Sequence, residues 1–181
     1  MIRIALLGIA LLVGAPAGVA AAACVPFPDD GWSDFGPWTR IDAAGQRWMK
    51  PEDLRALSFD KDGIAAVWIA AVKRFHNVGR DGRMVPVVTY DNGPDYFVEG
   101  LARTPANGKV GFIDRTLRVV IPARYDMAFP LEHGRAAVCN GCVPKRHGEH
   151  AFMEGGLWGM IDRDGREIVP PQYHSGEELP K

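Results

Sequence analysis

The sequence predicts an all-β fold, built as an array of stacked β-hairpin or three-stranded repeat units with one short helix. The main observation is internal repetition. Residues 108–125 align without a gap to residues 156–173 and share eight of eighteen residues, where unrelated segments would share about one. In each copy, apolar residues alternate over two short stretches around a turn, as β-hairpins do. One such unit has too little apolar surface to fold alone, so neighbouring units must stack on a shared face.

Residues 1–23 are predicted to be a secretory signal peptide, with a short basic start, an apolar run over 4–13 and small residues up to 23. Glycine and proline interrupt the run too early for a lasting membrane anchor, which needs about 20 apolar residues. Cys24 directly follows Ala21-Ala22-Ala23, and this junction resembles the lipobox of bacterial lipoproteins, although Ala21 stands where that pattern prefers Leu. Cys24 is therefore a lipidation candidate, with ordinary cleavage as the alternative. We expect an exported protein, periplasmic or extracellular, which is lipid-anchored to the envelope if Cys24 is acylated.

Composition argues against several classes of function. The formal net charge is −1 and the charges are scattered along the chain, so no field would recruit nucleic acid or an anionic membrane surface. The few serines do not form a nucleophile elbow, and His76, His133 and His174 have no paired acid at an interpretable spacing. We therefore expect a protein that is not an enzyme, has no cofactor, and neither binds nucleic acid nor spans a membrane.

Four repeat units are expected, of which the first two are degraded. Arg83-Met84-Val85-Pro86 leads to Tyr90 much as the later copies lead to Tyr125 and Tyr173, residues 59–67 parallel residues 129–138, and Ile41-Asp42 is the candidate Ile-Asp of the first copy. Proline and acidic residues at 51–57 predict the short helix. The expected division is a leader or cap over 24–37, units over about 38–67, 75–103, 108–138 and 156–174, an insertion loop over 139–155, and a flexible tail over 175–181.

Each unit is predicted to contain two strands joined by a tight turn, followed by a third strand. In the fourth unit the turn is Asp162-Arg163-Asp164-Gly165, where Gly can take a positive φ and Asp can accept hydrogen bonds from turn amides. Pro122 and Pro170 are expected to end the second strand, because proline cannot donate to a ladder. The expected repeat core comprises Val110, Phe112, Ile113, Pro122, Tyr125, Trp158, Met160, Ile161, Pro170 and Tyr173.

These residues resemble the WG-repeat (KWG) family, whose unit has Trp-Gly-aromatic-Ile-Asp, a turn, a Val/Ile-Pro stretch, Tyr-Asp, then Phe, an acidic-Gly pair and Ala-x-Val. The third and fourth copies match well, although Val110 stands at the Trp position that Trp158 occupies in the fourth. The fourth copy stops after Tyr173, without its Phe and Gly-x-Ala-x-Val part. The resemblance implies a bacterial β-rich repeat array with no common catalytic activity and a role in interaction.

The spacing between copies is broken by extra residues that include Cys139, Cys142, His147 and His150. Repeat proteins place individual features in such insertions, so this segment is the best candidate for a specific role. The first interpretation is a Cys139–Cys142 disulfide, formed in an oxidising compartment. The second is a zinc site with all four residues as ligands. The third is thiol-disulfide exchange at the Cys-x-x-Cys spacing, although no helix pattern follows it.

Two hypotheses for function follow. The first is a non-enzymatic, exported interaction module, which contacts an unidentified protein or envelope component through the concave or edge surface of the array and through the insertion. The alternative is a small extracytoplasmic metal-binding or thiol/disulfide protein that uses Cys139, Cys142, His147 and His150, with zinc as its metal.

Overall fold

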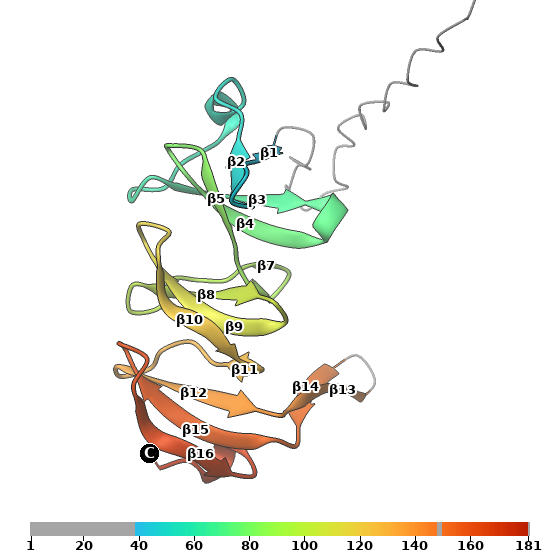
Figure 1. Cartoon of the computed structure of the whole chain (residues 1–181), viewed down its shortest axis with the longest axis vertical. Helices are drawn as coiled ribbons and strands as arrows, with labels where there is room; N and C mark the ends of the chain where they lie inside the picture. The colour runs from blue at the N-terminus through green and yellow to red at the C-terminus, as the bar shows by residue number, and fades with distance from the viewer. Residues whose placement is uncertain (1–38, 148–149, 181) are drawn as a thin grey trace, which may run out of the picture.

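The computed structural model describes residues 39–147 and 150–180, and these residues confirm the all-β class. The predicted signal peptide, the predicted leader segment and Cys24 lie outside the described residues. Three antiparallel sheets stack along the long axis of the molecule (Figure 1). The upper sheet has the order β1 (Thr39–Ile41), β2 (Arg47–Met49), β5 (Arg83–Pro86), β4 (Arg74–Gly79), β3 (Ile64–Ile69).

The middle sheet contains β10 (Val119–Tyr125), β9 (Lys109–Asp114) and β8 (Leu101–Ala106), in that order. The lower sheet has the order β11 (Met127–Ala128), β12 (Arg135–Asn140), β15 (Leu157–Asp162), β16 (Glu167–Tyr173). Two small hairpins lie beside these sheets, β6 (Thr89–Tyr90) with β7 (Gly93–Pro94) and β13 (Val143–His147) with β14 (His150–Glu154). The 3-10 turns are η2 (Leu54–Ala56), η3 (Ala70–Val72) and η4 (Gly176–Glu178). The short helix expected at 51–57 is thus only the turn η2.

The third strand of each unit pairs with the hairpin that follows it, not with the hairpin that precedes it. β8 pairs with β9, and β12 pairs with β15. Between β8 and β9 the chain turns at Asn107 and Gly108, which both have positive φ, and such a two-residue turn joins adjacent antiparallel strands. The predicted strands of each unit, a hairpin and a third strand, are therefore present. The prediction that the third strand pairs with the preceding hairpin was wrong.

The first two predicted units share one sheet. The β1–β2 hairpin pairs through β2 with β5, so four hairpins form three layers. The β4–β5 hairpin takes the place in the upper layer that β9–β10 and β15–β16 take below it. The separate first layer that the repeat count implied does not exist among the described residues.

The repeat aspartates form one recurring turn. The Oδ1 atom of Asp114 accepts the N–H groups of Thr116 and Arg118, at 2.8 and 3.1 Å. Asp162 does the same with the amides two and four residues later, both at 2.9 Å. Asp42 and Asp60 form the same pair of bonds in the upper layer. The carboxylate closes each turn because its oxygen satisfies amides that no strand partner reaches.

The glycine after the repeat tryptophan position is required by the strand beside it. β10 and β16 each shift register opposite this glycine, so that the backbone at Pro122 and Pro170 bends across it. A Cβ on Gly111 would lie 2.6 Å from the Ala123 nitrogen, and a Cβ on Gly159 would lie 2.7 Å from the Pro171 nitrogen. Only a residue without a side chain permits this approach.

Several residues of the expected core are less buried than predicted. Pro122 and Pro170 are exposed and do not end their strands, because the bend turns them to solvent while β10 and β16 continue to Tyr125 and Tyr173. Val110, Met160 and Tyr173 are half-buried. The other expected core residues, Phe112, Ile113, Tyr125, Trp158 and Ile161, are buried.

The apolar core lies between the layers. In each sheet an alanine faces a branched residue across the strand pair: Ala65 and Val78, Ala102 and Ile113, Ala136 and Ile161. All six are buried. The second pair packs against Ile64, Phe75 and Val85 of the upper layer, and the third packs against Leu101 and Phe112 of the middle layer.

A buried ion pair also joins the middle and lower layers. Arg103 Nη2 lies 2.6 Å from Asp95 Oδ1, and Arg103 Nε donates to Asp95 Oδ2 at 3.0 Å. The Arg103 Nη1 atom donates to the carbonyl oxygen of Ala128 in β11, at 3.1 Å. The two side chains are only 4% and 2% exposed, so neither charge has water as a substitute partner.

The first expected outcome concerns the bend. Gly111→Ala should lower the free energy of unfolding by about 1–3 kcal/mol, because backbone atoms rather than a movable side chain block the new methyl group. Urea unfolding measures this. Gly93→Ala is the matched control, since its Cβ would meet nothing closer than 3.7 Å. Equal stability of the two variants would contradict the packing of the bend.

The second expected outcome concerns the ion pair. Asp95→Asn should cost about 3–5 kcal/mol, because it leaves the Arg103 guanidinium buried without a counter-charge. The double variant Asp95→Leu/Arg103→Met should recover much of that loss, since it removes both charges. A double variant that is as unstable as Asp95→Asn alone would show that the charges are not the source of the cost.

Candidate binding groove at the end of the array

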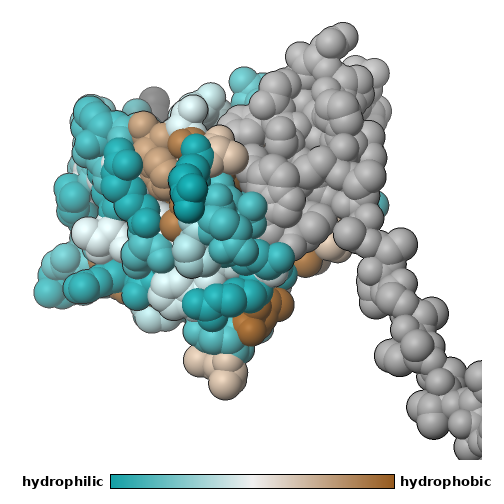
Figure 2. Space-filling view, turned by 90° about the horizontal axis from the view of Figure 1, so that it is seen from above, coloured by the Kyte–Doolittle hydropathy of each residue, from teal (hydrophilic) through white to brown (hydrophobic). Residues whose placement is uncertain are grey.

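The lower face of the last layer is hollowed by two adjoining cavities of about 820 and 650 Å³, which share Phe129, Ala137 and Gly176 in their walls. We call the two together the end groove. Apolar side chains dominate the larger cavity, and they are Met127, Phe129, Phe152, Met153 and Trp158. On the surface visible from above, hydrophobic residues lie only in small areas among hydrophilic ones (Figure 2).

The end groove exists because nothing among the described residues stacks on the lower sheet as that sheet stacks on the middle one. Arg103 and Phe112 form a cross-strand pair on the lower face of the middle sheet, and both are buried there. Ala137 and Met160 form the corresponding pair in the lower sheet and are only half-buried. The face that receives the next layer in one case is open in the other.

Trp158 forms the floor of the larger cavity. Its ring centroid lies 5.9 Å from that of Phe129, and a Cβ on Gly176 would lie 3.4 Å from the Cε3 atom of its six-membered ring. Trp158 forms one buried cluster with Cys139 and Cys142, and the partly buried residues packed against this cluster are Met127, Met153, Tyr173 and Leu179. The tail predicted to be flexible over 175–181 therefore forms the turn η4 and covers part of the tryptophan through Leu179. Residue 181 lies outside the described residues.

One wall of the groove is the β13–β14 hairpin, which corrects the insertion loop predicted at 139–155. Residues 139 and 140 belong to β12, and the hairpin follows. It takes the place that the Asn107-Gly108 turn has in the middle layer. At its base a Cβ on Gly156 would strike the backbone of Asn140 and Cys142, so the two ends of the insertion cross closely. Lys145 and Glu154 pair across it at 2.7 Å.

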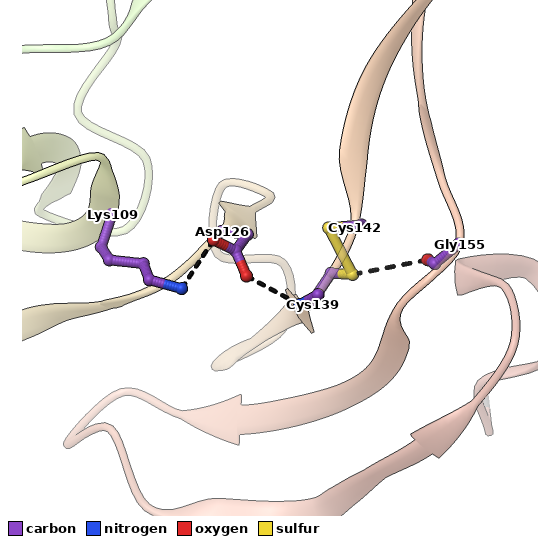
Figure 3. Close-up of a disulfide and its surroundings, with 6 residues drawn as sticks. Lys109, Asp126, Cys139, Cys142 and Gly155 are labelled. Carbon is purple, nitrogen blue, oxygen red and sulfur yellow. Dashed lines mark hydrogen bonds and ion pairs between the residues drawn. A yellow bond between two sulfur atoms is a disulfide. The ribbon is translucent and has the colours of Figure 1, made fainter.

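A disulfide between Cys139 and Cys142 closes the base of this hairpin (Figure 3). Beside it Asp126 Oδ2 accepts the Gly141 amide at 2.7 Å, and Asp126 Oδ1 binds Lys109 Nζ at 2.6 Å. The hydrogen bond from Lys109, aided by that from Gly141, holds the pKa of the Asp126 carboxyl below its usual value. Asp126, the aspartate of the Tyr-Asp pair in the repeat, thus connects the middle layer to the start of the insertion.

The disulfide does not support the zinc hypothesis for the insertion, and the burial of both cysteines disfavours thiol-disulfide exchange. Zinc would need both sulfurs as thiolates, and the disulfide occupies them. Exchange chemistry needs an accessible sulfur, and Cys139 and Cys142 are buried beneath Trp158. His147 and His150 face each other in backbone register at the far end of the hairpin, away from the two cysteines. Within residues 39–147 and 150–180, no cluster of three or more His, Cys, Asp or Glu could hold a metal.

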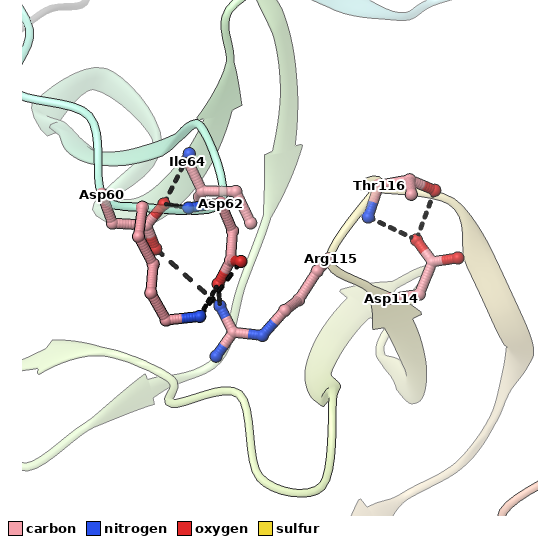
Figure 4. Close-up of polar contacts among 7 residues, drawn as sticks. Asp60, Asp62, Ile64, Asp114, Arg115 and Thr116 are labelled. Carbon is pink, nitrogen blue, oxygen red and sulfur yellow. Dashed lines mark hydrogen bonds and ion pairs between the residues drawn. The ribbon is translucent and has the colours of Figure 1, made fainter.

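A second polar cluster joins turns of adjacent layers (Figure 4). Arg115 Nη1 lies 2.6 Å from Asp62 Oδ2 and 3.8 Å from Asp60 Oδ2. The hydrogen bond from Lys61, together with the Arg115 charge, lowers the pKa of Asp62. Because these carboxylates are already engaged with Lys61, Arg115 and turn amides, the cluster is a connection between layers.

Sequence reasoning identified the insertion and Trp158 but missed the groove that they form. Phe129 could have been found, since it occupies the Phe position of the repeat. Phe152 and Met153 carry no signal of their own, because an insertion has no second copy to compare with. No helix within the described residues is long and apolar enough to cross a membrane.

The third expected outcome tests the disulfide. A Cys24→Ser chain, unfolded without reductant, should show no titratable thiol and no bound zinc. Opening the bond with Cys139→Ser/Cys142→Ser should cost about 2 kcal/mol, because the closed loop is short. Thiol titration, metal analysis and urea unfolding give these values. Two free thiols together with one zinc ion would restore the metal hypothesis.

Comparison with protein families gives a match to the WG containing repeat over residues 111–141 and 158–177. Searches of curated proteins and of solved structures gave no match. The matched segments begin at or next to the two glycines under the strand bends, and each includes its bend and its repeat tyrosine. Residues 111–141 and 158–177 are therefore WG repeats.

Proposed function

We propose that this protein is a non-enzymatic, exported interaction module that binds another protein or an envelope component through the end groove. The observation that carries this proposal is the open apolar face of the last layer, because the same face is buried one layer higher. WG repeats are a repeat module, which supports a role in interaction rather than catalysis. The signal-peptide pattern of residues 1–23 supports export, and Cys24 remains the candidate for lipid attachment.

The chemistry of the groove suits a protein segment. Met127 and Met153 adapt their shape to a partner, and Phe129 and Trp158 offer large apolar surfaces at little cost in conformational entropy. The two cavities adjoin, so a partner can run from one into the other. Phe152, which is 55% exposed on the hairpin wall, would become buried in such a complex.

The fourth expected outcome tests this function by affinity capture from an envelope extract. Phe152→Asp should reduce the recovered partner at least about fivefold, because it places a charge in the wall of an apolar groove. Val119→Asp is the matched control, since Val119 is 60% exposed on β10, outside the walls of the groove.

Capture should be unchanged by the control substitution. Equal recovery with wild type and Phe152→Asp would rule out the groove as the contact surface. Equal loss in both variants would show that the effect comes from surface charge in general.

A further inference from the structure

We infer that the end groove accepts an extended β-strand of a partner protein, which carries small apolar side chains at alternate positions and a basic flank, and which pairs with residues 174–177. This inference rests on the proposed function and names the class of partner. It follows from how the chain itself covers the same face one layer higher.

The first step is a hydrogen bond that occurs twice in the chain. The Val88 amide donates to the Arg103 carbonyl at 3.1 Å, and the Phe129 amide donates to the Ala137 carbonyl at 2.9 Å. Arg103 and Ala137 hold the same register position in β8 and β12. In both cases a segment that leaves one layer pairs through its backbone with the first strand of the next layer.

The second step is the segment after the last repeat tyrosine. Residues 126–132 follow Tyr125, and residues 174–180 follow Tyr173 at the same spacing, so that Glu177 corresponds to Phe129 and Leu179 to Leu131. Within the described residues the Glu177 amide donates no hydrogen bond. The single turn η4 is closed by a long bond of 3.4 Å from the Leu179 amide to the Gly176 carbonyl. The donor that would bind an incoming strand is present and unused.

The third step is the size of the side chains that fit. Beneath the middle layer, Ala136 and Val138 of β12 pack against Leu101 and Phe112. Beneath the upper layer, Ala102 of β8 packs against apolar residues of that layer. The lower layer offers Ala137 and Met160 at the corresponding place, above the 650 Å³ cavity. A strand with small apolar residues at alternate positions therefore fills the space that β12 fills one layer higher.

The fourth step is charge. The ionisable residues that line the two cavities are Glu132, Arg135, Glu154 and Glu177, with His133 and His174. With neutral histidines these give −3 + 1 = −2, or −1 when Lys145, the ion-pair partner of Glu154, is included. Lys145 pairs with Glu154, whereas Glu132 and Glu177 are in no ion pair among the described residues. A basic partner is favoured. A second copy would present the same acidic rim, and an anionic lipid surface would likewise be repelled.

The test uses the full chain and a fluorescent peptide of sequence GRAAVKV, which repeats residues 134–138 and adds a basic residue. Anisotropy should show saturable binding. Glu177→Pro should weaken it about fivefold to tenfold, because proline removes the amide that pairs with the strand. Glu177→Ala keeps the amide, so it should cost about twofold, and that cost should disappear at about 0.5 M salt.

A second variant keeps the test independent of the turn. Ala137→Tyr should abolish peptide binding, because the ring fills the cavity beneath Met160, and urea unfolding of both variants checks that they fold. Unchanged binding by folded Glu177→Pro would overturn strand addition. Equal binding of GEAAVEV would overturn the basic flank.

Other occupants are separate outcomes. Sedimentation that shows a dimer dissolved by Phe129→Asp, or binding to phosphatidylglycerol vesicles lost in the same variant, would overturn the partner strand. If peptide binding is absent while capture still depends on Phe152, this inference fails and the proposed function stands. If capture is also independent of Phe152, both fail.

Discussion

The structure depends on the burial of one pair, an alanine and a branched residue, in the middle sheet and in the lower sheet, each beneath the layer above it. Ala102 with Ile113 and Ala136 with Ile161 hold the same register position and are all buried. A three-stranded sheet has two apolar faces and cannot satisfy both alone, so each layer completes the core of its neighbour. The four residues of these two pairs therefore explain why the array is continuous.

The other repeated residues serve this stacking. Gly111 and Gly159 let the neighbouring strand bend across them, and the bend carries the chain to the tyrosine that enters the next interface. The aspartates close the hairpins and leave the strands free to pack. Arg115, Arg103 and Asp126 then join adjacent layers through polar contacts. The residues of the repeat signature thus all contribute to the stacking of one sheet on the next.

The hairpins and their turns could be predicted, because two copies of a pattern reveal which positions matter. The pairing of β8 and β12 with the following hairpin could not be predicted. A repeating sequence does not show where one structural unit ends and the next begins, so each strand could belong to the hairpin on either side. The exposure of Pro122 and Pro170 was missed because a strand-ending proline and a proline at a bend look alike in sequence. Asp95 and Arg103 lie in a weak copy, and the better copies have no matching pair that would have marked them.

The end groove follows from the same constraint. The lower sheet covers the middle sheet, but no further sheet among the described residues covers the lower one, so its outer apolar face stays open. The most direct test of mutual dependence is native-state hydrogen exchange of Ile113→Ala, a substitution in the middle layer only. The account predicts that amides of β3 and β4 in the upper layer lose protection along with those of β8 and β9, with a similar change in opening free energy. Loss of protection confined to the middle sheet would contradict it.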